Sequence, residues 1–170
     1  MAAAITAHYD VKLDVEETLA ISQDLSAAET TFTHKVTETT RGTLNATSTP
    51  AVTKAWSDKV NLVAGAATLD LTALSGPAGT TVDFTGLKVQ LVKLACPASN
   101  TAGITVDRGA TNAYNLFGAD NASAEQVEVL PGASWVLYAN DKTEDVSATI
   151  KNVQLAGTGT ESIEIILVAG

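Results

Sequence analysis

Cysteine is almost absent from this sequence, and aromatic residues are few. Cys96 is the one cysteine among 170 residues, so neither a disulfide nor a thiolate metal site can form within one chain. Because Cys96 lies between Ala95 and Pro97, directly after an apolar run, we expect a small buried side chain rather than a reactive thiol. Aromatic residues make up 5 % of the chain, which argues against the aromatic-rich cleft expected of a glycoside hydrolase.

Positive charge is also scarce. The 10 lysines and arginines stand against 19 aspartates and glutamates, which gives a formal net charge of −9. An acidic chain without a basic stripe repels phosphate backbones, so we expect no nucleic acid as a partner. No apolar run reaches the ~18 residues of a membrane-spanning helix, and residues 1–5 lack the basic start of an export signal, so we expect no membrane partner either.

Sequence signatures of catalysis are missing as well. Neither a Gly-x-Ser-x-Gly elbow nor a phosphate-binding Gly-x-x-x-x-Gly-Lys-[Ser/Thr] loop occurs. The Gly157-Thr158-Gly159 segment lacks the third glycine of a dinucleotide site and suits the turn of a last hairpin. We therefore expect that the protein is not an enzyme and that it uses no cofactor.

Candidate metal ligands are sparse. His8 and His34 are the two histidines, and each lies on an alternating segment beside Thr or Tyr. Their spacing fits no metal motif, so we expect surface or interface residues. Segment 140–145 offers clustered oxygen atoms for Ca²⁺, but Lys142 in its middle favours an ordinary acidic turn. No metal site is expected.

The sequence has instead a period-two alternation of apolar and polar residues, which predicts half-buried β-strands. The expected strands are 5–15, 52–63, 68–72, 82–95, 104–106, 114–117, 127–130, 135–138, 146–155 and 161–169. Further Thr-rich strands are expected over 29–47, with a turn at Arg41-Gly42. Segment 14–27 fits a strand or, through Asp14 and Glu17, a capped helix, and we favour the strand.

The spacing of the strands, with turn signals such as Pro131-Gly132 between them, predicts an all-β fold. We expect a jelly-roll-like antiparallel β-sandwich over 65–170, with an N-terminal β-strand extension over 1–64 that forms an arm or adds strands. Trp135 follows that turn on an apolar strand and is expected in the core. Trp56 lies among polar residues, and the sequence leaves open whether it fills the core or an interface. The interface candidates are Trp56, Phe32 and His34.

Turn and strand patterns occur in six short segments of the chain. These segments are 17–20 (ETLA), 69–74 (LDLTAL), 82–90 (VDFTGLKVQ), 109–112 (GATN), 129–132 (VLPG) and 163–165 (IEI). They resemble small β-sandwich virion proteins of tailed bacteriophages, which are capsid decoration proteins and head or tail accessory proteins. The resemblance is clearest over 60–170. It implies a non-enzymatic role, assembly on a particle surface and oligomers.

We therefore expect a structural virion protein that attaches to the major capsid protein or to other virion proteins through protein–protein contacts. A homo-oligomer is expected, with a trimer favoured, at the virion surface after synthesis in the host cytoplasm. The Thr-rich N-terminal strands supply edges that can add to a neighbouring subunit. The alternative is a carbohydrate- or cell-surface-binding module. Its candidate aromatic cluster is Tyr114, Phe117, Trp135 and Tyr138.

A third hypothesis is a small β-sandwich metalloenzyme of the cupin type. Such a site needs several inward-facing histidines, and the chain has two, far apart in sequence.

Overall fold

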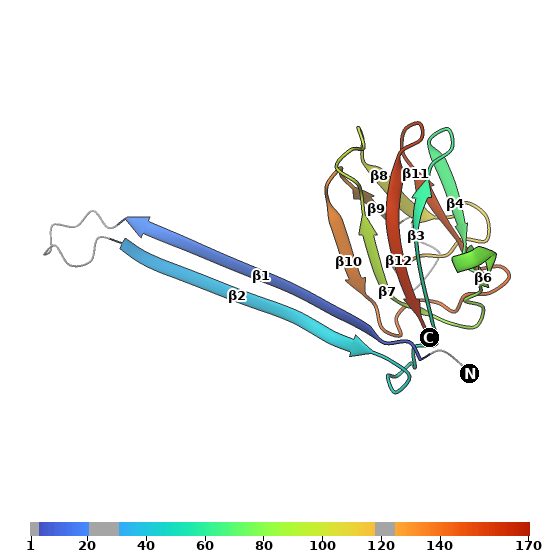
Figure 1. Ribbon diagram of the computed structural model, residues 1–170, viewed down its shortest axis with the longest axis horizontal. Helices are drawn as coiled ribbons and strands as arrows, with labels where there is room; N and C mark the ends of the chain where they lie inside the picture. The colour runs from blue at the N-terminus through green and yellow to red at the C-terminus, as the bar shows by residue number, and fades with distance from the viewer. Residues whose placement is uncertain (1–3, 21–30, 118–124) are drawn as a thin grey trace, which may run out of the picture. The chain divides into compact units, whose positions relative to one another are not determined.

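The computed structural model describes residues 4–20, 31–117 and 125–170, and the side chains of 17–20 and 31–34 lie outside that description. The chain divides into two compact units (Figure 1). One unit is Met1–Ile5 together with Asn45–Gly170, and the other is Thr6–Leu44. The first is a β-sandwich and the second is a two-stranded hairpin.

The β-sandwich has two four-stranded antiparallel sheets. Its strands are β3 (Lys54–Asn61), β4 (Ala66–Asp70), β7 (Val89–Ala95), β8 (Ile104–Arg108), β9 (Gln126–Val129), β10 (Ser134–Tyr138), β11 (Asn152–Ala156) and β12 (Ser162–Ala169). One sheet has the order β10-β7-β12-β3 and the other has the order β4-β11-β8-β9. Between β4 and β7, the short strands β5 (Leu74–Ser75) and β6 (Thr81–Val82) pair around the 3-10 turn η1 (Pro77–Gly79).

The order of pairing identifies the sandwich as a jelly roll. The first of the eight sandwich strands pairs with the last (β3 with β12), the second with the seventh (β4 with β11), the third with the sixth (β7 with β10), and the fourth with the fifth (β8 with β9). This nesting is that of one long hairpin folded over itself, so the two sheets lie face to face (Figure 1). The predicted all-β, jelly-roll-like antiparallel sandwich is confirmed.

The core fills the space between the two sheets. On β12, Ile163, Ile165 and Leu167 are buried and alternate with outward-facing residues. Across the ladder, Ile165 pairs with Leu94 and Leu167 with Val92, both also buried on β7. The facing sheet contributes Ile104, Val106, Val153 and Leu155. Small and β-branched side chains therefore suffice to close the gap between the sheets.

The hairpin consists of β1 (Ala7–Ala20) and β2 (Thr31–Leu44), two strands of 14 residues. They pair antiparallel without a register shift, from Ala7 with Leu44 to Ala20 with Thr31. The preference for a strand over residues 14–20 is thus confirmed, and 21–27 lie outside the described residues. The turn expected at Arg41-Gly42 is wrong, because both residues lie inside β2, opposite Asp10 and Tyr9.

The boundary between arm and sandwich differs from the expected one. The sequence placed it between residues 64 and 65, whereas the units divide between Leu44 and Asn45. The reason is β3, which lies before residue 64 in sequence but pairs with the last strand along its whole length.

Three expected strands are shorter or absent. Of 82–95, Val89–Ala95 forms β7, because the chain turns at Gly86, whose φ is 78°. Of 146–155, Asn152–Leu155 lies in β11, after a turn in which Ser147 bonds to Ile150. Segment 114–117 forms no strand. Each of the three segments alternates like a strand. Outside the observed strands, however, their backbone groups form hydrogen bonds in turns and loops rather than with a neighbouring strand.

Two predictions of burial have different outcomes. Cys96 is buried at 3 % exposure, as expected. Trp135 was expected in the core, but 52 % of its surface is exposed. Trp135 pairs with the core residue Leu94, but it lies on β10, an edge strand that has a neighbouring strand on one side only. In the part of the chain that the structure describes, no helix is long and apolar enough to cross a membrane.

Candidate functional site

The hairpin has one apolar face. Because β1 and β2 pair in register, the odd-numbered residues of β1 share a face with the even-numbered residues of β2. This face, which we call the apolar face, carries Tyr9, Val11, Leu13, Val15, Val36, Glu38, Thr40 and Gly42. Val11, Leu13, Val15 and Val36 are between 45 % and 61 % exposed. A set of large aliphatic side chains this open is a candidate contact surface.

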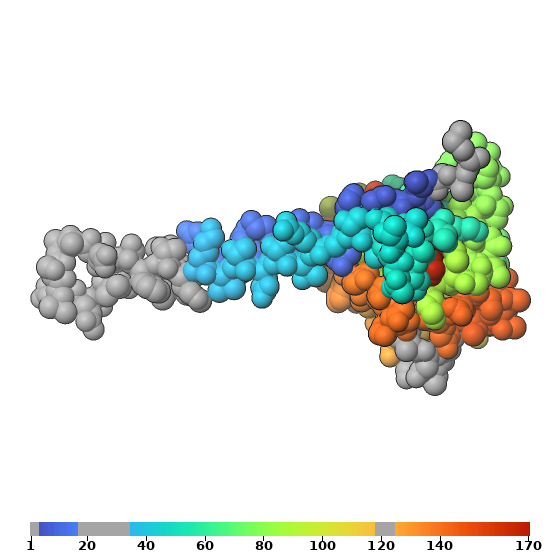
Figure 2. Space-filling model, turned by 90° about the horizontal axis from the view of Figure 1, so that it is seen from below, coloured from blue at the N-terminus to red at the C-terminus, as the bar shows by residue number. Residues whose placement is uncertain are grey.

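The opposite face of the hairpin is polar and locally paired. The Lys12 ammonium lies 2.6 Å from Asp14, and the Thr37 hydroxyl donates to Asp14 at 2.8 Å. These two hydrogen bonds, the one from Lys12 first, lower the pKa of the Asp14 carboxyl below its usual value. Lys35 lies 3.7 Å from Glu16 across the strands. The two faces therefore differ in chemistry along the paired strands, whose described residues are the blue and cyan spheres of the space-filling view in Figure 2.

The structure separates the three interface candidates. Phe32 and His34 lie on β2, opposite Leu19 and Glu17, in the stretch whose side chains are not described. Trp56 lies in the sandwich, is 5 % exposed, and donates its indole Nε1–H to the Ser75 carbonyl at 2.8 Å. Trp56 is therefore a core residue of this chain rather than an exposed contact.

The two histidines occupy distant register positions of the hairpin. His8 pairs with Thr43, whose hydroxyl lies 3.0 Å from the ring Nδ1, whereas His34 pairs with Glu17. Within the described ranges, no three side chains of the metal-binding types gather. In segment 140–145, Lys142 lies 2.9 Å from Asp141. The same Lys142 contact lowers the pKa of the Asp141 carboxyl.

The aromatic cluster proposed for glycan binding does not assemble as expected. Tyr114 is fully buried. Phe117 and Tyr138 line a pocket of about 350 Å³, together with Leu116, Leu137, Ala139, Lys142 and Thr143. Trp135 is exposed but does not line this pocket. Two of the four aromatic side chains therefore share a site.

A larger polar pocket of about 580 Å³ lies where the β7–β8 and β11–β12 loops meet. Glu161 is its acidic residue, and its Oε1 accepts hydrogen bonds from the Thr101 amide, the Thr101 hydroxyl and the Ala102 amide at 2.7 to 2.9 Å. The hydroxyl of Thr101 contributes most, and these donors together hold the pKa of Glu161 below its usual value. Through Oε1, this carboxylate joins the two loops.

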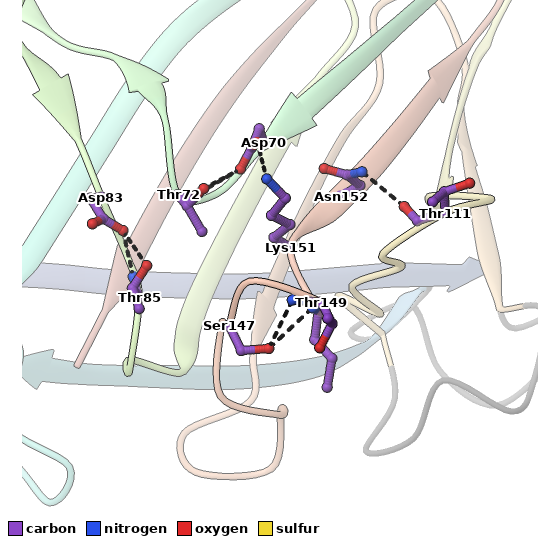
Figure 3. Close-up of polar contacts among 10 residues, drawn as sticks. Asp70, Thr72, Asp83, Thr85, Thr111, Ser147, Thr149, Lys151 and Asn152 are labelled. Carbon is purple, nitrogen blue, oxygen red and sulfur yellow. Dashed lines mark hydrogen bonds and ion pairs between the residues drawn. The ribbon is translucent and has the colours of Figure 1, made fainter.

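Short polar contacts also fix the loops near β4 and β11 (Figure 3). Asp70 accepts from the Thr72 hydroxyl at 2.6 Å and lies 2.6 Å from the Lys151 ammonium. Asp83 accepts from both the amide and the hydroxyl of Thr85. Because neighbouring donors already bind both carboxylates, they act as turn-forming groups rather than as an acid–base pair.

The outer face of the β10-β7-β12-β3 sheet carries a second, smaller apolar surface. Val136, Tyr138 and Ile166 are each about 40 % exposed. The register places Lys93 between Val136 and Ile166, so a charge interrupts this surface. Among the described residues, the hairpin thus offers the longer row of exposed aliphatic side chains. The sequence signal for it was the alternation over residues 5–15, read as a half-buried strand.

Comparison with known proteins adds no relative. No family model matches the chain, and no curated protein and no solved structure is significantly similar to it.

Proposed function

We propose that this protein is a structural component of a tailed-phage particle and that it attaches through protein–protein contacts rather than by catalysis. The jelly roll forms the rigid body, and the hairpin supplies the contact element. Support comes from the segment resemblance over 60–170 and from the fold, which is common in virion proteins. Capsid decoration is the role we favour, with the major capsid protein as the partner.

The observation that carries the proposal is the open apolar face of the hairpin. A two-stranded hairpin is marginally stable in water and needs another layer over its apolar face. Val11, Leu13, Val15 and Val36 are exposed on the hairpin, and in this proposal the covering layer belongs to another molecule. A long hairpin whose apolar face becomes covered when the protein binds its partner is suited to attach the protein to a particle.

The test is co-sedimentation of the full-length protein with heads of the phage whose genome carries the gene, checked by electron microscopy. The variant Leu13→Asp places charge on the apolar face and should abolish binding. The matched control is Thr39→Asp, which adds charge at an exposed position on the polar face and should bind as the wild type does. Wild-type protein that stays in the supernatant would refute the proposal.

A second candidate function is glycan binding at the pocket beside Phe117 and Tyr138. The specific observation is an aromatic pair at the rim of a 350 Å³ pocket that also contains Lys142 and Thr143. Aromatic side chains with a nearby ammonium donor suit a sugar ring. A glycan array probed with the wild type and with Tyr138→Ala tests it, and an array without hits eliminates it.

A further inference from the structure

The sandwich has four edge strands, and three of them carry a charged residue. In β3, Asp58 and Lys59 are charged, and the Asp58 carboxylate accepts the Lys59 amide at 2.8 Å. β4 has five residues and ends with Asp70. β9 has four residues, one of which is Glu128. Short or charged edge strands of this kind resist the addition of a further strand.

β10 is the edge strand without a charge. Its sequence, SWVLY, has no charged residue, no proline and no glycine. Trp135 is 52 % exposed and Val136 is 42 % exposed. Figure 1 shows β10 at the margin of its sheet, with β7 on one side only. An apolar edge strand that is open in this way is a site to which another strand can add.

The backbone of β10 has hydrogen-bonding groups on its open side. The Ala139 amide donates to the Gln90 carbonyl at 2.9 Å, just after the strand. Just before the strand, the Ala133 carbonyl accepts from the Cys96 amide at 3.0 Å. Because bonded and non-bonded pairs alternate in an antiparallel ladder, the N–H and C=O of Val136 point away from β7. Among the described residues, these two groups have no partner.

We propose that the open edge of β10 binds an extended, uncharged segment of another protein, which adds to the four-stranded sheet as a fifth strand. The unpaired backbone groups select an extended chain, and the apolar side chains beside them select apolar residues in it. This inference goes beyond the proposed function, which assigns the contact with the particle to the hairpin.

A pocket at the C-terminal end of β10 selects a foreign segment over a second copy of β10. Two β10 strands would pair about a two-fold axis at Val136, which places Ala133 and Gly132 of the second copy past Tyr138. Side chains this small leave the pocket of about 350 Å³ beside Phe117 and Tyr138 unfilled. A segment of different sequence can place one large apolar side chain there. A sugar ring in the same pocket would exclude that side chain.

The test uses the full chain and a panel of capped peptides of about eight residues, in which threonine alternates with valine, leucine or phenylalanine. NMR measures hydrogen exchange at the Val136 amide. Tryptophan fluorescence follows Trp135, because Trp56, the other tryptophan, is buried. We expect at least one peptide to slow exchange at Val136 about tenfold or more and to shift the Trp135 emission to shorter wavelength. Unchanged exchange at Val136 with every peptide at about 1 mM would overturn the proposal.

Two controls separate strand addition from unspecific adsorption. Val136→Lys adds a charge to the open edge and should weaken peptide binding about tenfold or more. Ser57→Lys adds the same charge at an exposed position of β3, the other edge strand of this sheet, and should leave binding unchanged. A peptide methylated at every amide nitrogen keeps its side chains but has no backbone donor, so it should not bind. Equal binding by the two variants, or by the two peptides, would overturn strand addition.

The remaining outcomes separate this inference from its alternatives. Protection of the Val136 amide that increases with protein concentration in the absence of peptide would assign the edge to a second copy and overturn the foreign segment. The experiment contains no phage heads. Failure of peptide binding therefore refutes the β10 site alone, and failure of co-sedimentation refutes the attachment role alone.

Discussion

At the scale of single residues, Tyr114 shows how a side chain can organise a segment without regular structure. Its hydroxyl accepts a hydrogen bond from the Val89 amide at 3.1 Å and donates one to the Glu144 carbonyl at 3.0 Å. Burial raises the pKa of the Tyr114 hydroxyl above its usual value. The apolar segment 114–117 is therefore held by the side chain of Tyr114 rather than by a ladder.

We predict that Tyr114→Phe lowers the free energy of unfolding by about 2 kcal/mol, because it leaves the Val89 amide and the Glu144 carbonyl without this partner. Urea unfolding followed by tryptophan fluorescence measures the change. An unchanged midpoint would show that water replaces the hydroxyl at no cost.

Asp70 ties β4 to the residue that precedes β11. Burial favours the protonated form, but hydrogen bonds from Lys151 and Thr72 outweigh it and hold the pKa of Asp70 below its ordinary value of 3.8. A carboxyl whose pKa is lowered on folding stabilises the fold at pH values above its unfolded pKa. That contribution is lost as the pH falls through the lowered folded pKa.

Asp70→Asn should therefore cost about 1 kcal/mol at neutral pH, a modest value because the pair is partly exposed. The difference from the wild type should shrink as the pH falls below about 4. Chemical denaturation at a series of pH values measures it, with Asp58→Asn at an exposed position of β3 as the control. A difference that is constant down to pH 2 would contradict the assignment.

At the scale of elements, the sequence pattern predicts a strand well where the pattern and the pairing agree. Segments 127–130, 135–138 and 161–169 alternate, and the structure has β9, β10 and β12 there. Segment 82–95 alternates equally well, yet it divides at Gly86. Alternation states which residues share a face, but it does not state which strand lies alongside, and pairing decides where a strand ends.

The same limit explains the two tryptophans and the candidate site. Trp135 follows a strong turn on an apolar strand, and no local pattern reveals that half of its surface is exposed on an edge strand. Trp56 is buried in the core of the sandwich, and a carbonyl 19 residues away accepts its indole hydrogen. The alternation behind the apolar face can be read in residues 5–15, but it does not state that Val11, Leu13 and Val15 of the two-stranded sheet are exposed.

The loops at one end of the sandwich approach closely at Gly65. Its amide donates to the Gly159 carbonyl at 2.7 Å, and the Gly157 amide donates to the Gly65 carbonyl at 2.8 Å. A Cβ at Gly65 would lie 2.7 Å from the Gly157 oxygen, and φ there is +82°. Gly86 has a similar φ of +78° but open space around it.

We predict that Gly86→Ala costs about 1 kcal/mol from backbone strain alone, and that Gly65→Ala costs clearly more because the two loops must also move apart. Thermal unfolding of the two variants measures the difference. Equal losses would show that the β3–β4 and β11–β12 loops separate freely.

At the scale of the whole molecule, the division into two units has a physical consequence. The jelly roll has its own core. Its eight strands pair with one another, from the outermost pair in sequence (β3 with β12) to the innermost (β8 with β9). The hairpin begins and ends at paired residues, since Ala7 lies opposite Leu44. Its two ends are therefore separated by about 5 Å between Cα atoms, a gap that a short glycine linker closes.

We predict that replacing Thr6–Leu44 by such a linker leaves the sandwich folded, because no sandwich strand is removed. The melting temperature should stay within about 4 °C of the wild type, which corresponds to roughly 1 kcal/mol for a domain of this size. Circular dichroism and calorimetry provide the measurement. As a control, Tyr114→Phe should destabilise the shortened chain as it destabilises the full one, which would show that the core is intact. An unfolded or aggregated product would show that the sandwich depends on the hairpin and that the two units form one cooperative structure.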